Sequence, residues 1–140
     1  MRFVLIALIF LAGLFDLMMA ASFLFTPQDA GAKLGVTAIG LMGGPQGAAA
    51  GLSTLRADFT AFFGVAAFCM MWGTWRRNGD LLLVPALLFG VAFAGRAINL
   101  ALVGSYPGWW LGMAVEAFHF TLLLAAWRIL PHHRIAEIAG

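Results

Sequence analysis

Residues 81–103 read LLLVPALLFGVAFAGRAINLALV, a long apolar run interrupted by a single charged residue, Arg96. A helix that crosses the hydrocarbon core of a bilayer needs about 20 mainly apolar residues. Pro85 lies in the first turns of the run, where proline is better tolerated than in mid-helix. The run therefore predicts a transmembrane helix.

Three further apolar runs flank this one, at residues 3–25, 55–75 and 109–130. The chain has 140 residues, of which 63% are hydrophobic and 10% charged, whereas about a quarter of a soluble domain is charged. In lipid, only helices and closed barrels satisfy every backbone polar group, and barrel strands alternate apolar and polar residues. The unbroken runs therefore predict an all-α fold, an integral membrane four-helix bundle with up-down topology, as a single transmembrane domain over residues 1–140.

The first run begins like a signal peptide, with Arg2 before it and Ala20-Ala21-Ser22 as a candidate cleavage site. Its apolar stretch is longer than the central region of a signal peptide, and Asp16 interrupts it. We expect it to be retained as the first span.

Residues 26–54 form a long connection rich in glycine and alanine. The connection is too weakly apolar to predict another span, and connections of this length are often ordered or functional. Residues 34–42 are expected to form a short interfacial helix or to dip partly into the membrane.

Basic residues set the orientation, because cytoplasmic flanks collect Lys and Arg. One side holds Arg2, Arg76, Arg77, Arg128 and Arg134, and the other holds Lys33 and Arg56. Both termini are therefore predicted to be cytoplasmic. Because the basic residues lie at the ends of the spans, no nucleic-acid partner is expected.

Charged and polar residues inside the runs form a predicted polar layer. Its members are Asp16, Arg56, Asp58, Arg96, Asn99, Glu116 and His119. Charges within spans are costly and usually face the bundle interior in pairs. With cytoplasmic termini and a rise of about 1.5 Å per residue, all seven fall in the outer half of the membrane, drawn from all four spans. The layer is a candidate ligand site.

Two contacts of this layer can be predicted. Arg96 and Glu116 lie at matching depth on adjacent antiparallel spans, so we expect a buried ion pair. Asp16 is flanked by small residues, including Gly13, that let a neighbouring helix approach. Arg56 and Asp58 point to different faces of their helix and should find separate partners, unless Arg56 extends toward the interface.

Motifs for metal, cofactor or catalysis are weak. Glu116 and His119 have the Glu-x-x-His spacing of di-iron bundles, but the second such motif is missing. Cys69 lies in an apolar run, and nucleotide-binding and hydrolase motifs are absent. No catalytic residue, metal or cofactor is predicted.

Several segments resemble an uncharacterised domain-of-unknown-function family of small bacterial four-helix membrane proteins. They are Leu55-Arg56-Ala57-Asp58, Gly95-Arg96-Ala97-Ile98-Asn99, Tyr106-Pro107-Gly108 and Glu116. The chain departs from the family pattern at Thr60 and Ala61, where glycines are often seen, and in carrying Asp58. The resemblance implies a multi-pass protein of the bacterial inner (cytoplasmic) membrane and supplies no activity.

Two functions remain open. The first is a non-enzymatic accessory subunit of a larger membrane complex, or a small homo-oligomer, with the polar layer closed and dry. The alternative is a binding or enzymatic bundle for a lipid-, sterol- or quinone-like molecule near Glu116, Asp16 and His119. The alternative predicts a cavity that opens from the outer half.

Overall fold

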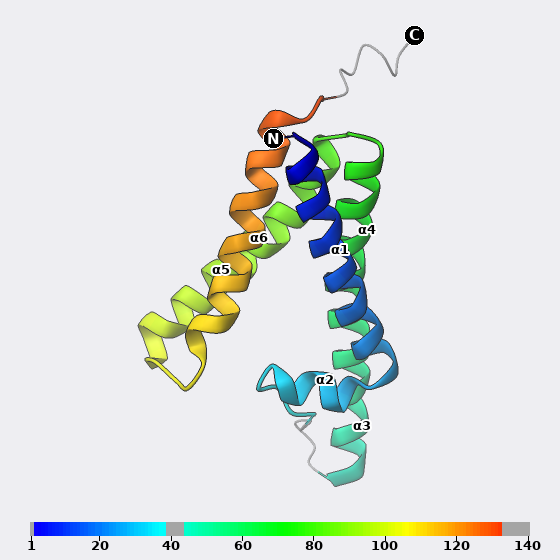
Figure 1. Cartoon of the computed structure of the whole chain (residues 1–140). Coiled ribbons are helices and arrows are strands. Elements are labelled where there is room, and N and C mark those ends of the chain that lie inside the picture. Colours follow the sequence, from blue (N-terminus) through cyan, green and yellow to red (C-terminus); the bar gives the residue numbers. More distant parts are fainter. Residues whose placement is uncertain (1, 39–43, 133–140) are drawn as a thin grey trace.

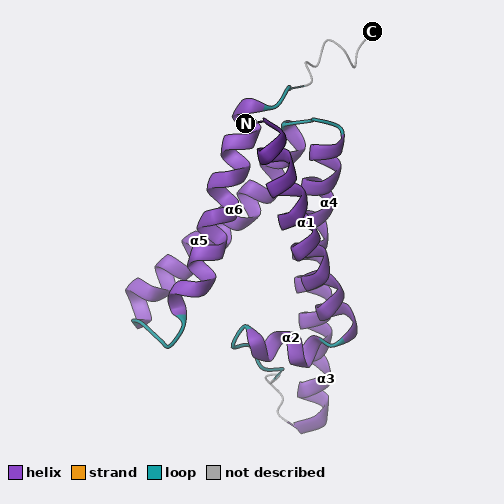
Figure 2. Cartoon of the chain, viewed as in Figure 1, coloured by secondary structure: helices purple, strands orange, loops and turns teal. Residues whose placement is uncertain are grey.

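The computed structural model describes residues 2–38 and 44–132, and these residues form five continuous helices joined by short connections, with no strand among them (Figures 1 and 2). The elements are α1 (Arg2–Phe25), α2 (Pro27–Lys33), α3 (Gly44–Thr54), the π-helical segment η1 (Leu55–Phe59), α4 (Thr60–Trp75), α5 (Asp80–Val103) and α6 (Trp109–Ile129). α3, η1 and α4 run on as one helix.

Four helices are long and apolar enough to cross a membrane. They are Arg2–Phe25, Gly44–Trp75, Asp80–Val103 and Trp109–Ile129. Their outer surfaces carry many exposed large apolar side chains, among them Leu11, Phe68 and Leu102, which is typical of lipid-facing helices. The predicted all-α, up-down bundle of a multi-pass membrane protein is therefore confirmed.

The second of these helices begins earlier than the sequence predicts. It starts at Gly44 instead of residue 55 and is 32 residues long, which at 1.5 Å per residue is about 48 Å. The expectation of one long connection over residues 26–54 is wrong here, because residues 44–54 are helical although they are weakly apolar. Pro45 lies in the first turn, where proline is tolerated, and Gly51 packs against the Ala38 backbone. Within the predicted interfacial segment, residues 34–38 are not helical, and residues 39–43 lie outside the described part of the chain.

α1 and α4 pack together closely along their length (Figure 1). Gly13 marks the tightest approach, since a Cβ atom there would lie 2.9 Å from Met71 Cγ and 3.2 Å from Met70 Cβ. The predicted approach of a neighbouring helix beside Asp16 is confirmed.

The main apolar core lies near the end of the bundle that holds the N-terminus. Its fully buried members are Ile9, Ala66, Met70, Leu82, Ala86, Phe89, Leu123, Ala126 and Leu130. At this end the chain after α6 is tied to the α4–α5 turn: the Gly79 amide donates to the Pro131 carbonyl at 2.9 Å, and His132 Nδ1 lies 2.7 Å from Asp80 Oδ1. We call the half of the bundle that holds this core and these contacts the closed half.

In the other half the bundle divides into two arms (Figure 1). One arm consists of the C-terminal part of α1 with α2, α3 and η1. The other consists of the C-terminal end of α5 and the N-terminal end of α6. The first arm has a small core of its own around Phe23, Ala30 and Leu55. In α5 no residue beyond Phe89 is buried, and in α6 none before Glu116. This half, which we call the open half, therefore lacks a core shared by all four spans.

Candidate functional site

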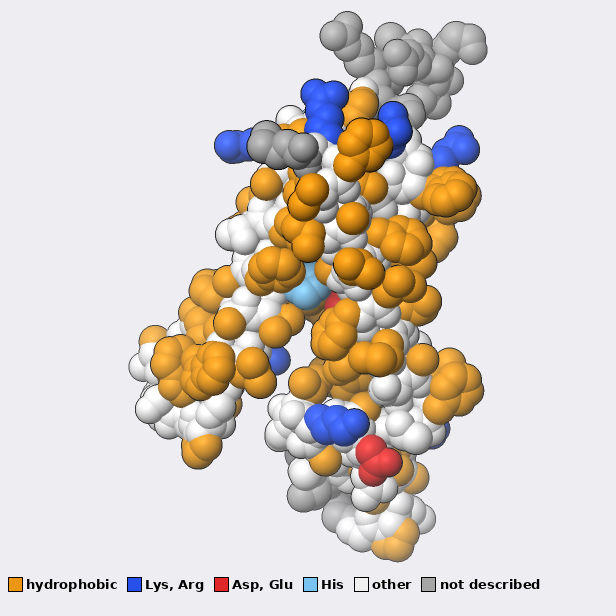
Figure 3. Space-filling model, viewed as in Figure 1, with side chains coloured by type: hydrophobic (Ala, Val, Ile, Leu, Met, Phe, Trp, Pro, Cys, Tyr) orange, Lys and Arg blue, Asp and Glu red, His pale blue; other side chains and the backbone are white. Residues whose placement is uncertain are grey.

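Polar side chains are buried where the two arms meet. Asp16 of α1 is 1% exposed, and Glu116 and His119 of α6 are 7% and 4% exposed. They follow directly on the apolar core, since Phe89 of that core stacks on the His119 ring with centroids 4.3 Å apart. Figure 3 shows a histidine and an acidic side chain at the closed end of the gap between the arms.

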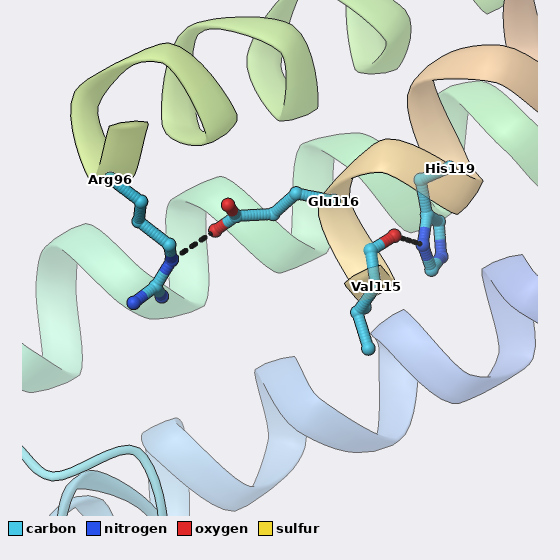
Figure 4. A network of polar contacts seen from close by, with 4 residues as sticks. All are labelled: Arg96, Val115, Glu116 and His119. Atoms are coloured by element: carbon cyan, nitrogen blue, oxygen red, sulfur yellow. Dashed lines mark hydrogen bonds and ion pairs between the residues drawn. The ribbon is translucent and has the colours of Figure 1, made fainter. Parts of the chain in front are cut away.

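Arg96 and Glu116 join α5 to α6. Arg96 Nε donates a hydrogen bond to Glu116 Oε1 at 2.6 Å (Figure 4), so the predicted ion pair is confirmed. Only its Glu116 end is buried, because the Arg96 side chain is 37% exposed. The guanidinium lies over Gly112, where a Cβ atom would come within 3.1 Å of Arg96 Cζ. The missing side chain at Gly112 therefore leaves room for the pair.

His119 and Asp16 face one another between α6 and α1. His119 Nδ1 lies 2.8 Å from the Val115 carbonyl oxygen (Figure 4). A carbonyl only accepts, so Nδ1 carries a proton and is the donor of this bond. The other ring nitrogen, Nε2, lies 3.7 Å from Asp16 Oδ2, beyond the range of about 2.7–3.2 Å for such a hydrogen bond. The bond to the Val115 carbonyl thus orients the ring so that its Nε2 edge is turned to Asp16.

Four buried atoms of this group have no hydrogen-bond partner among the described residues: both Asp16 carboxylate oxygens, Glu116 Oε2 and His119 Nε2. Native structures rarely leave buried polar atoms unpaired, and each costs roughly 1–3 kcal/mol. In the Nδ1–H ring, His119 Nε2 is an acceptor, and the three carboxyl oxygens are acceptors when both acids are ionised. In that charge state, none of the four atoms can donate to another.

The structure brings together four of the seven residues of the predicted layer: Asp16, Arg96, Glu116 and His119, hereafter the buried polar cluster. Arg56, Asp58 and Asn99 are exposed and lie outside it. Arg56 Nε donates to the Leu24 carbonyl oxygen at 3.0 Å, satisfying a backbone group at the end of α1 that no further helical turn can reach. The second span thus contributes only the exposed Arg56 and Asp58 to the predicted layer. The buried polar cluster comes from three helices, α1, α5 and α6.

A groove between α1 and α6 reaches the buried polar cluster. Its volume is about 500 Å³, and it is lined by Leu8, Leu11, Ala12, Phe15, Ala114, Val115, Phe118 and His119. This size is within the range of about 300–1,000 Å³ found for small-molecule sites. The lining is apolar except for His119. The sequence placed the cavity at Glu116, Asp16 and His119, and of these three only His119 lines the groove, so the expected contact of the cavity with Glu116 is not found.

A second hollow lies between α1 and α4, with a volume of about 350 Å³. It is lined by Phe10, Leu17, Gly64, Phe68, Met71, Trp72 and Trp75. None of these side chains is titratable, so this hollow offers packing for apolar chains and, as polar groups, only the indole N–H of Trp72 and Trp75.

The sequence marked Ala12 as a small residue beside Asp16, but it did not identify Ala114, which lines the groove with it, or the aromatic support from Phe89. Metal binding has no support in residues 2–38 and 44–132, where no three His, Cys, Asp or Glu side chains gather into a candidate site. Glu116 of the Glu-x-x-His pair is held by Arg96 instead.

Comparisons with known proteins give no match: no protein family, curated protein or solved structure is similar enough to this chain. No family is therefore identified, and the resemblance noted in the sequence stays an expectation. The function has to be argued from the site.

Proposed function

We propose that this protein binds an amphipathic molecule in the membrane, with the tail in the groove between α1 and α6 and the polar group at His119 and Asp16. One observation carries the proposal: an apolar groove is lined by His119, whose buried Nε2 has no hydrogen-bond partner and lies 3.7 Å from Asp16 Oδ2. The proposal needs no reaction, so the protein acts as a binding protein.

A purely structural role accounts for only part of the buried polar cluster. Arg96 and Glu116 satisfy one another and link two helices, as a register-fixing pair would. His119 and Asp16 do not, because 3.7 Å separates their nearest polar atoms and both Asp16 oxygens are unpaired. A bound polar group at this point supplies the partners that the protein does not.

The orientation gives the direction of entry. Arg2, Arg76, Arg77 and Arg128 lie at the closed end, where Figure 3 shows basic side chains gathered. Under the positive-inside rule the closed half faces the cytoplasm and the open half faces outward. We therefore propose a protein of the bacterial inner membrane that takes up its ligand from the outer leaflet.

The accessory-subunit or homo-oligomer hypothesis stays a prediction. The outer turns of α5 and α6 expose apolar side chains such as Leu102 and Trp110. Lipid covers such side chains as well as a partner helix does, so their exposure does not favour a protein partner.

A blocked groove tests the proposal. Ala114→Trp places a large ring in the groove lining, whereas Ala125→Trp places the same ring on an exposed position of the same helix. We expect wild type and Ala125→Trp, purified from native membranes in mild detergent, to retain a bound amphiphile in native mass spectra, and Ala114→Trp to lose it.

The readout is the fraction of protein carrying the adduct, with helical content measured by circular dichroism as the folding control. Equal occupancy in Ala114→Trp and Ala125→Trp, with both variants folded, would place the ligand elsewhere. A wild-type protein that carries no amphiphile, and takes up none on addition of long-chain compounds, would rule the function out.

A further inference from the structure

Resting on this proposed function, we infer the chemistry of the ligand's polar end: the groove takes a single-chain amphiphile with a primary ammonium head group. The inference comes from three unpartnered atoms of the α1–α6 contact, two of which, Asp16 Oδ2 and His119 Nε2, lie 3.7 Å apart. The three atoms are Asp16 Oδ1, Asp16 Oδ2 and His119 Nε2.

The hydrogen bonds available at this contact require a donor with more than one proton. His119 Nδ1–H is committed to the Val115 carbonyl, so Nε2 presents a lone pair toward Asp16. Two kinds of acceptor thus face each other. A primary ammonium has three N–H donors, whereas a hydroxyl has one and leaves the second acceptor unpaired.

The distance fits one bridging nitrogen. His119 Nε2 and Asp16 Oδ2 are 3.7 Å apart, and a single nitrogen can lie about 2.8–2.9 Å from both. A proton alone does not bridge them, because hydrogen bonds of this kind span about 2.7–3.2 Å between heavy atoms. The contact is too wide for a direct hydrogen bond. A nitrogen beside the pair can bond to both atoms, and because both atoms are shielded from the surface, His119 and Asp16 have to move apart to admit it.

Charge favours the same head group. Asp16 is buried, and the nearby cation of the cluster, Arg96, is held by Glu116. An ammonium next to Asp16 forms a charge-assisted hydrogen bond, which is stronger than a neutral one. A quaternary ammonium has no N–H to donate, and a carboxylate or sulfate would add a negative charge beside Asp16.

The groove also selects the rest of the molecule. No Lys or Arg is among its lining residues, which are apolar apart from His119. The phosphate of an aminophospholipid would follow its ammonium into this lining without a basic partner, at a high desolvation cost. A single alkyl chain with a terminal amine has no such charge, so we assign the site to that class.

The test uses three photoreactive probes with the same twelve-carbon chain, the same diazirine position, and an amine, a hydroxyl or a carboxyl end. The protein is held in nanodiscs of phosphatidylcholine, whose head group has no N–H donor. We expect all labelling at saturation to map to α1 and α6 peptides. We expect the amine probe to half-saturate at a concentration at least about tenfold below the alcohol, the ratio that one charge-assisted bond supports, and the acid probe to bind most weakly.

A charge-neutral variant gives the matched comparison. Asp16→Asn keeps the side-chain size and should remove the preference of amine over alcohol, while Asp58→Asn changes an exposed carboxylate and should leave it intact. Circular dichroism and gel filtration report folding. Should Asp16→Asn fail to fold, the ranking of the three probes on wild type decides the question by itself.

The outcomes separate the two claims. No saturable labelling of α1 and α6 by any probe overturns the proposed binding function. Labelling in which the alcohol or acid equals the amine overturns the ammonium head group and leaves the binding function standing. Displacement of the amine probe by added phosphatidylethanolamine overturns the assignment to a single-chain molecule.

Discussion

Gly13→Leu is expected to weaken the bundle by about 3 kcal/mol, the upper part of the usual range for overpacking a tight contact. The first atom of the new side chain would already lie 2.9 Å from Met71 Cγ, 3.2 Å from Met70 Cβ and 3.4 Å from the Ala67 carbonyl oxygen. Met70 Cβ is fixed to the α4 backbone and cannot turn aside as the Met71 side chain can, so α1 and α4 have to separate. Unfolding in mixed micelles with increasing denaturing detergent, followed by circular dichroism, measures the loss.

Gly95→Leu is the matched control. A Cβ atom at Gly95 meets nothing within 4 Å, and the position lies in the open half on the exposed side of α5. Leucine also favours helix over glycine, by roughly 0.8 kcal/mol in a helix interior. The control should therefore be as stable as wild type or slightly more so, and equal losses in the two variants would contradict the close α1–α4 packing.

Glu116→Gln is expected to cost about 2–3 kcal/mol. Removing one partner of a fully buried ion pair typically costs about 3–5 kcal/mol. The value here should be lower because the Arg96 side chain is 37% exposed and can turn toward solvent or head groups. The same micelle unfolding assay measures the loss, and Asp58→Asn serves as the control for a change of one charge.

A double-mutant cycle separates the ion pair from the individual side chains. Arg96→Met, Glu116→Gln and the double variant should give a coupling free energy of about 1–3 kcal/mol, as residues in one hydrogen-bond network do. Gly112→Ala perturbs the same pair independently, because the added Cβ atom crowds the guanidinium. Additive effects within about 0.5 kcal/mol would show that the pair contributes no coupling.

The spans could be predicted from the sequence because lipid imposes a simple rule on long apolar runs. The Arg96–Glu116 pair could be predicted for a related reason. Fixing the topology fixes depth, and depth brings residues on adjacent antiparallel helices to the same level. Both predictions rest on position along the helix axis, which the sequence gives directly.

Features that depend on helix rotation and tilt could not be predicted in this way. Asp16 and His119 meet only because α1 and α6 present these particular faces to one another, and the sequence does not give that rotation. The placement of Arg56 depends on where α1 ends, since it caps the Leu24 carbonyl and so leaves the predicted layer. The groove needs the divergence of the two arms, which no local pattern encodes.

The helical start of the second span was missed for a different reason. Residues 44–54 are too weakly apolar to resemble a span, and their three glycines and Pro45 do not favour helix by propensity. Leu55, at the η1 segment, packs into the small core with Phe23 and Ala30, so tertiary contacts hold the helix at this point. Hydropathy alone cannot report such contacts.

The position of the buried polar cluster connects the fold with the proposed function. In the closed half, apolar side chains from all four spans fill the interior. Where the arms diverge, that shared packing ends, and His119 and Asp16 are buried without enough protein partners. The divergence therefore provides both an apolar groove and a polar end for one ligand.

Nitrogen-15 NMR of the histidine rings tests this account most directly. The chain has three histidines, so histidine-selective labelling in nanodiscs gives a simple spectrum, and the His119 signals are assigned by their loss in His119→Gln. The account predicts a ring protonated at Nδ1, with an unprotonated Nε2 whose resonance moves when dodecylamine saturates the groove and stays in place with dodecanol. A ring protonated at Nε2, or an Nε2 resonance that ignores dodecylamine, would contradict it.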